Sequence, residues 1–206
     1  MRNKKMYIIG IGILALILLV FLNPAQVLTK TLLRITGDYQ TPHEENSESI
    51  LSKTSQDHLY YDRLYSIRDY KSFRDFQRKG ISVIPFVQIY NRDKKMLTNA
   101  SGSECAWALM NYFAQKDSAQ LKTGDDQMYH FIEDRLTPID IKTDQDTFDY
   151  YLFLGWANYI PKLSKNLFIQ TNKMAETMKG RVCFSYINFD MQKPWEAEAS
   201  SLNEKE

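Results

Sequence analysis

The sequence predicts an α+β protein in which an N-terminal transmembrane helix precedes a small sheet that several helices cover. Three observations lead to this fold class. Residues 6–22 form an uncharged apolar run, residues 81–91 and 181–190 have the composition of strands, and most of the remaining chain has helical composition ended by glycine or proline. Roughly 155 residues follow the first 49, which is enough for one domain with its own hydrophobic core.

The apolar run has the features of an uncleaved membrane anchor. As a helix its seventeen residues would span roughly 26 Å, and their side chains favour insertion by roughly 4–7 kcal/mol. A cleaved signal peptide is the alternative, but its apolar core is usually shorter, and Asn23-Pro24-Ala25 lacks the small first residue of a cleavage site. Lys4 and Lys5 predict that residues 1–5 stay in the cytoplasm. We therefore expect an inner or plasma membrane protein whose folded part is periplasmic or extracellular.

The rest of the chain divides by composition into three parts. Residues 23–49 are expected to form a juxtamembrane helix followed by a polar linker with turn-forming residues. Residues 50–195 are expected to fold as the extracytoplasmic α+β domain, and residues 196–206 as a polar, flexible tail.

The first half of the domain predicts two helices and a hairpin. Between residues 57 and 79 the apolar side chains recur every third position. On one straight helix such a stripe would wrap around the axis, so we expect two helices with a break near Asp69. Gly80 is placed to end the second helix. Residues 81–91 alternate as a strand in which Pro85 implies an edge, a bulge or a cis turn, and a short second strand returns after the following turn.

The second half predicts four helices and one central strand. Residues 146–160 are rich in aromatic side chains and end at Pro161, and Gly180 is placed to cap the last helix. Residues 181–190 are apolar on both faces, which favours a place in the middle of the sheet. The expected helices are residues 105–115, 124–136, 146–160 and 163–179.

Charge and motifs limit the partners. Residues 1–40 carry a net charge of +4 and residues 41–206 carry −3. A mildly acidic domain without a basic stripe gives no electrostatic basis for nucleic-acid binding. The sequence also contains no cofactor motif, so we expect no cofactor and no nucleic acid. The expected partners are the membrane, through a single span, and other proteins.

The two cysteines leave two interpretations open. In an oxidising compartment Cys105 and Cys183 could form a disulfide, or both could be small buried hydrophobic residues. Cys105 lies in the first turn of an expected helix, where the helix dipole lowers a thiol pKa. It is a candidate nucleophile if a histidine such as His130 serves as its base. The alternative is a thiol packed beside Trp107.

A cluster of carboxylates is the candidate metal site. Asp140, Asp144 and Asp146 follow one another within one polar loop, and oxygen-rich loops can hold a cation such as Ca²⁺. The spacing of an EF-hand is absent. The alternative for Asp144 and Asp146 is to cap the helix that follows.

Residues 70–115 run as helix, glycine, Ile84-Pro85-led strand, turn, Gly102 and helix. This order resembles the closing part of a thioredoxin-like fold, in which the proline is cis and lies beside the redox cysteines. The resemblance covers under a quarter of the chain, and no Cys-x-x-Cys motif is present. Residues 174–192 resemble the helix–strand unit that precedes this part in thioredoxins, so a single thioredoxin-like fold would need a permuted order.

Three functions follow from these observations. The first is a non-catalytic subunit or accessory factor of a membrane complex, such as a secretion or conjugation complex, acting on the extracytoplasmic side. The second is a membrane-tethered thioredoxin-like protein that aids folding without its own redox pair. The third is an envelope enzyme that uses Cys105 or the carboxylates at residues 140–146.

Overall fold

The structure of the chain is a computed structural model that describes residues 45–81, 83–114, 125–143, 145, 147–192 and 195. All of them belong to one compact unit, Thr41–Glu206. The predicted anchor at residues 6–22 and the predicted tail at 196–206 lie outside the described residues. No helix in the described part of the chain combines the length and apolarity that a membrane crossing requires.

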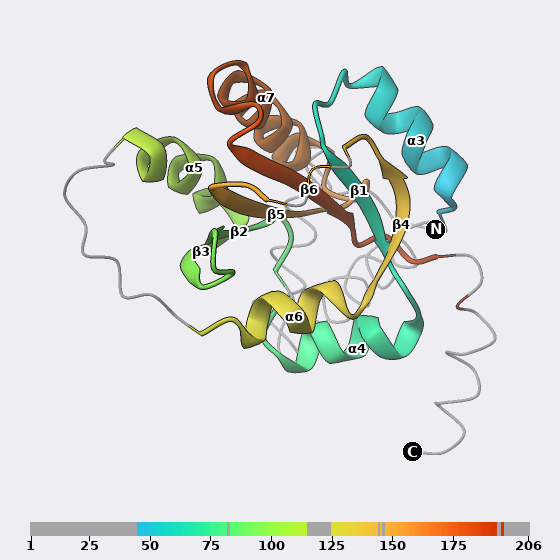
Figure 1. Ribbon diagram of the computed structural model, residues 1–206. Helices are drawn as coiled ribbons and strands as arrows, with labels where there is room; N and C mark the ends of the chain where they lie inside the picture. Colours follow the sequence, from blue (N-terminus) through green and yellow to red (C-terminus); the bar gives the residue numbers. More distant parts are fainter. Residues whose placement is uncertain are drawn as a thin grey trace, which may run out of the picture. The chain divides into compact units, whose positions relative to one another are not determined.

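A mixed sheet forms the centre of this unit (Figure 1). Within the described residues it has six strands in the order β3–β2–β5–β6–β1–β4. The neighbours β5, β6 and β1 run parallel, while β2 runs antiparallel to β5, β3 to β2, and β4 to β1. The strands are β1 (Arg63–Ile67), β2 (Phe86–Asn91), β3 (Met96–Ser101), β4 (Leu136–Ile141), β5 (Tyr150–Trp156) and β6 (Val182–Asn188).

Helices cover both faces of the sheet (Figure 1). On one face α7 and α5 lie side by side, with α3 beyond them, and α4 and α6 cover the other face. The mixed α+β fold class predicted from the sequence is confirmed. The helices are α3 (Ser47–Gln56), α4 (Tyr70–Arg78), α5 (Cys105–Ala114), α6 (Gln127–Glu133) and α7 (Pro161–Met178), with a short 3-10 turn η1 (Gly102–Glu104) before α5.

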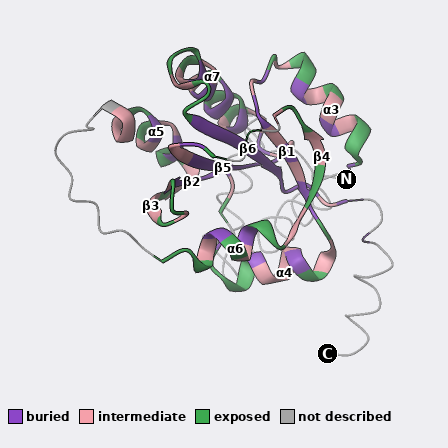
Figure 2. Cartoon of the chain, in the orientation of Figure 1, coloured by how far each residue is buried: buried purple, intermediate pink, exposed green. Residues whose placement is uncertain are grey.

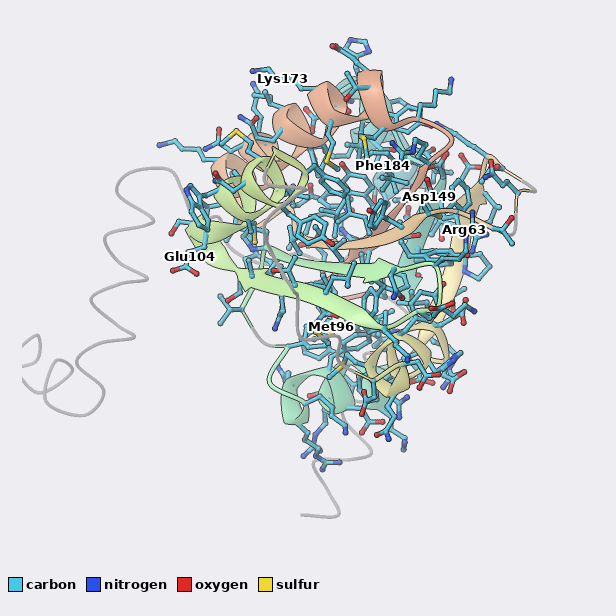
Figure 3. All side chains as sticks on the ribbon, turned by 60° about the vertical axis from the view of Figure 1, so that its left-hand side comes forward. Arg63, Met96, Glu104, Asp149, Lys173 and Phe184 are labelled. Carbon is cyan, nitrogen blue, oxygen red and sulfur yellow. The ribbon has the colours of Figure 1, made fainter. Side chains whose placement is uncertain are left out.

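The core lies on both sides of the central strand β6, whose seven residues are all buried (Figure 2). Alternate side chains of β6 point to opposite faces. Phe184 and Tyr186 belong to one core cluster with Leu167 and Phe168 of α7, and Figure 3 shows Phe184 between the sheet and that helix. Cys183 must therefore face the α4 and α6 side.

Three predicted helices are wrong in whole or in part. The helix expected at residues 146–160 does not form. Residues 150–156 are strand β5, because a seven-residue apolar run that is buried on both faces suits a strand. Residues 63–67 form β1, so only the second half of the stretch 57–79 is helical. The stretch 124–136 is shortened to α6, because β4 begins at Leu136.

The remaining differences lie at element ends. The break near Asp69 is present, since the Asp69 side chain caps α4 by accepting a hydrogen bond from the Ser72 N–H at 2.6 Å. Helix α3 begins at Ser47, within the expected linker at residues 23–49 and before the expected domain start at residue 50. Strand β2 begins at Phe86 instead of residue 81. The central place predicted for residues 181–190 is confirmed.

Candidate functional site

The carboxyl ends of the parallel strands β5 and β6 form the candidate site, because open sheets of this kind bind ligands at that edge. β5 ends at Trp156, and the connection at residues 157–160 leads into α7, whose first residue is Pro161. On the neighbouring strand Phe86 pairs with Gly155, so Pro85 lies level with Trp156, the last residue before this connection. The peptide bond between Ile84 and Pro85 is cis.

A buried hydrogen-bond network fills this end of the sheet. The backbone N–H of Asn158 donates to both carboxylate oxygens of Asp190, at 3.0 and 2.8 Å, and its side-chain amide donates to Glu45 at 2.8 Å. The Asn188 amide donates to Asp190 at 2.7 Å, and the Gln192 amide donates to the Asn188 side-chain oxygen at 3.2 Å. Because these polar groups bond one another, the network holds the connection before α7 in place.

Two buried side-chain nitrogens in the described residues lack a hydrogen-bond partner. They are the indole nitrogen of Trp156 and Nε of Arg63. Trp156 is fully buried and packs edge-on against Phe168, with ring centroids 5.3 Å apart. The indole N–H is therefore a donor in apolar surroundings, at the end of the sheet where β5 and β6 terminate.

Both thiols are free, buried and on opposite faces of the sheet. The disulfide considered from the sequence is not formed, because Cys105 belongs to the core on the α5 and α7 side while Cys183 faces α6. The Cys105 Sγ donates to the carbonyl of Pro85 at 3.3 Å. Burial raises the pKa of Cys105 to about 12 and that of Cys183 to about 11, so burial outweighs any effect of the helix dipole. Neither thiol is set up as a nucleophile.

His130 does not meet Cys105. It is exposed on α6, and its nearest carboxylates, Asp126 and Glu133, both lie 3.9 Å away. Helix α6 covers the face of the sheet opposite to α5 (Figure 1). The thiol–histidine pair that the enzyme hypothesis needs is therefore not brought together by these two residues.

The carboxylate cluster is only partly described. Asp140 lies on β4 and accepts a hydrogen bond from the Tyr61 hydroxyl at 2.7 Å. Burial and this bond raise the pKa of Tyr61 above its usual value. Asp144 and Asp146 lie outside the described residues. Among the residues that are described, no three metal-binding side chains gather.

Sequence reasoning missed a groove between α5 and α7. Its volume is about 350 Å³, and its lining is apolar except for a lysine and a glutamine. Only the side-by-side placement of two helices far apart in the sequence creates it, so no local signal could have revealed it. The lining residues are Leu109, Met110, Phe113, Gln170, Lys173 and Met174.

Comparison of the chain with protein-family models, with curated proteins and with solved structures gave no match.

Proposed function

We propose that the chain is a membrane-anchored accessory protein of an extracytoplasmic complex, with a thioredoxin-like folded part that acts by binding and not by thiol exchange. The anchor and the outward orientation come from the sequence of residues 1–22. The thioredoxin-like part and the absence of thiol chemistry draw on the geometry of the described residues.

The arrangement of the elements supports the thioredoxin-like part. In space, β5, α7 and β6 make a parallel strand–helix–strand unit, and β2 pairs with β5 on its other side. The hairpin β2–β3 and the following α5 complete the four-stranded part of the arrangement. In the chain, the hairpin and α5 come first and the strand–helix–strand unit second, which is the permuted order that the resemblance requires.

The observation on which the proposal depends is the connection beside Pro85. In a thioredoxin-like protein the redox cysteines lie beside the cis proline. Here the connection at that place, residues 157–160, reads Ala-Asn-Tyr-Ile and has no cysteine. The thiol that does reach Pro85 is Cys105, and it is buried, with its pKa raised to about 12. A protein built this way can bind a partner but has no thiolate to exchange.

Purification of the full chain from membranes tests the proposal. After chemical cross-linking and mild detergent, we expect mass spectrometry to identify the same protein partners for the wild type and for Cys105→Ala. A chain that purifies alone would contradict the role in a complex. Loss of the partners in Cys105→Ala, with an unchanged circular dichroism spectrum, would contradict action without the thiol.

Protease digestion of intact and of permeabilised cells tests the orientation. Residues 45–195 should be cleaved when protease is added to the outer side of the membrane that holds the chain. Cleavage only after that membrane is opened would place the folded part in the cytoplasm and contradict the proposed location.

A further inference from the structure

We propose that one surface of the folded part rests on an anionic lipid bilayer. This surface, called here the α5–α7 outer surface, consists of Trp107, Met110, Lys165, Ile169 and Lys173, all exposed. Trp107 is 65% exposed, Met110 51% and Ile169 42%, which are large fractions for such apolar side chains. The inference goes beyond the proposed function, and it uses the proposed anchor only to keep the domain near a membrane.

Helix geometry places these residues together on the solvent side. On α5, Cys105 and Leu109 are buried against the sheet, and Trp107 is turned about 200° from Cys105 around the helix axis. On α7, Lys165, Ile169 and Lys173 recur at four-residue spacing and form one stripe on the outside. Figure 3 shows Lys173 on the outer side of α7, away from Phe184 beneath it. Because the two helices lie side by side, the stripe and the exposed residues of α5 share one surface.

The charges on this surface are mostly positive. Helix α5 contains no charged residue but follows the exposed Glu104, and α7 contains three lysines against the single acid Glu176. Within the described residues Lys165 and Lys173 have no ion-pair partner, although other lysines, such as Lys53 and Lys71, pair with aspartates. Unpaired lysines beside a bilayer of anionic lipids are attracted to its surface.

The residue types favour lipid over a protein partner. On α7 the exposed Ile169 stands singly between Lys165 and Lys173, whereas the core of a protein interface is a contiguous apolar area depleted of lysine. Tryptophan prefers the membrane–water interface, and lysine can lay its stem along apolar surface while its ammonium group reaches the headgroups. Amphipathic surfaces of this composition lie in the interfacial plane of a membrane.

The tether does not decide which face meets the membrane. The twenty-two residues between the predicted span and Glu45 reach at most about 75 Å when extended. A segment of this length does not by itself select a face of the domain, so we assign the docked face from its own surface chemistry.

Fluorescence of Trp107 tests the docking in the full chain. The chain has three tryptophans, and Trp156 and Trp195 are only 0% and 2% exposed, so a quencher in the lipid reaches Trp107 first. The full chain is incorporated into vesicles with brominated acyl chains, made of phosphatidylcholine alone or with phosphatidylglycerol. We expect quenching in the anionic vesicles, little in the neutral ones, and loss of the quenched component in Trp107→Phe.

Charge variants separate the surface from general electrostatics. Lys165→Gln and Lys173→Gln should each weaken docking roughly fivefold. The control Lys71→Gln removes the same charge from α4, on the other face of the sheet, and should leave the quenching unchanged. Equal quenching in both vesicle types, or an equal effect of Lys71→Gln, would overturn the proposal. Protection of Trp107 by a protein fraction but not by lipid would also overturn it.

Flotation of the same vesicles distinguishes this proposal from the anchor. If the chain floats with both vesicle types while Trp107 stays unquenched, the result supports the anchor and contradicts the docked surface. A chain that floats only with the anionic vesicles, with Trp107 quenched, supports the docked surface and contradicts the anchor.

Discussion

At the level of single residues, Gly155 in β5 leaves room for the ring of Phe86. A Cβ at Gly155 would lie 2.1 Å from a ring carbon of Phe86, whereas carbon atoms pack at about 3.5–4 Å. The ring cannot move freely, because it packs edge-on against Phe189 with centroids 5.4 Å apart. We expect Gly155→Ala to lower the free energy of unfolding by about 1–3 kcal/mol in urea denaturation. The double variant with Phe86→Leu should recover part of this loss, and an unchanged midpoint for Gly155→Ala would contradict the overlap.

The two thiols give a second prediction at this scale. Because burial raises the pKa of Cys105 to about 12 and of Cys183 to about 11, almost no thiolate exists near neutral pH. We expect both cysteines to react with a thiol reagent such as 5,5′-dithiobis(2-nitrobenzoate) only after denaturant unfolds the domain. Both should then react together, since the sheet that separates them is shared by the two core layers and unfolds with both. Rapid labelling of either thiol in the native protein would contradict the buried positions.

At the level of elements, the cap of α4 has a measurable role. Asp69 accepts the hydrogen bond of the Ser72 N–H at the start of the helix, and Asp69→Ala should cost about 1 kcal/mol of folding stability. The matched control is Asp126→Ala, because Asp126 holds the same position before α6 but its side chain makes no capping bond. Equal losses in urea denaturation would show that the cap is not the cause.

The same cap gives the stability a pH dependence. Burial by itself would raise the pKa of Asp69, but the hydrogen bonds from Ser72 and Arg68 outweigh it and hold the pKa below its ordinary value. A lowered pKa in the folded state stabilises the protein above about pH 4 and loses this contribution as the pH falls through the lowered value. Asp69→Ala should therefore weaken the acid dependence of the unfolding midpoint. An identical slope in the variant and the wild type would contradict a charged cap.

The elements that the sequence predicted correctly are those with local start and stop signals. Helices α5 and α7, the β2–β3 hairpin and β6 are bounded by residues such as Gly80, Gly102, Pro161 and Gly180, and Gly80, Gly102 and Gly180 have φ near +60 to +80°. The missed strands β1, β4 and β5 lack such signals. Their strand state depends on pairing with partners far along the chain, and local propensity is a weak guide to it. A proline such as Pro138 usually argues against a strand, yet it is tolerated within β4 because β4 is an edge strand of the described sheet.

The candidate site was less predictable than the fold. The sequence directed attention to residues with reactive groups, namely Cys105, Cys183, His130 and the acidic loop. In the structure the sheet separates Cys105 from Cys183 and from His130, a separation that depends on the alternation of β6 and on which face each helix covers. The network around Asp190 and the groove between α5 and α7 both join segments that are far apart in sequence, so single motifs could not indicate them.

At the level of the whole molecule, one network ties the two ends of the described chain together. Glu45 and Gln192 form an isolated parallel β-bridge, and the backbone N–H of Glu45 donates to the Met191 carbonyl at 2.8 Å. Its carboxylate accepts from the Asn158 amide, and Asn158 in turn donates its backbone N–H to Asp190. The start of the domain, the connection before α7 and the segment after β6 are therefore held as one unit, with Asp190 fully buried at its centre.

Substitution of Asp190 tests this coupling. In Asp190→Asn an NH2 group replaces one carboxylate oxygen. Because the Asn158 N–H contacts both oxygens, this NH2 faces the Asn158 N–H, and a donor meets a donor inside the core. Leaving a buried donor unsatisfied costs about 1–3 kcal/mol, and we expect a loss of this size in urea denaturation. Hydrogen exchange should show faster exchange in α3 and at the start of α7 together, because both depend on the network. The control Asp57→Asn breaks an ion pair with Lys53 at the surface, which is worth at most about 1 kcal/mol, and should leave exchange in α7 unchanged. Faster exchange confined to the residues next to Asp190 would show that the network does not couple the two ends of the domain.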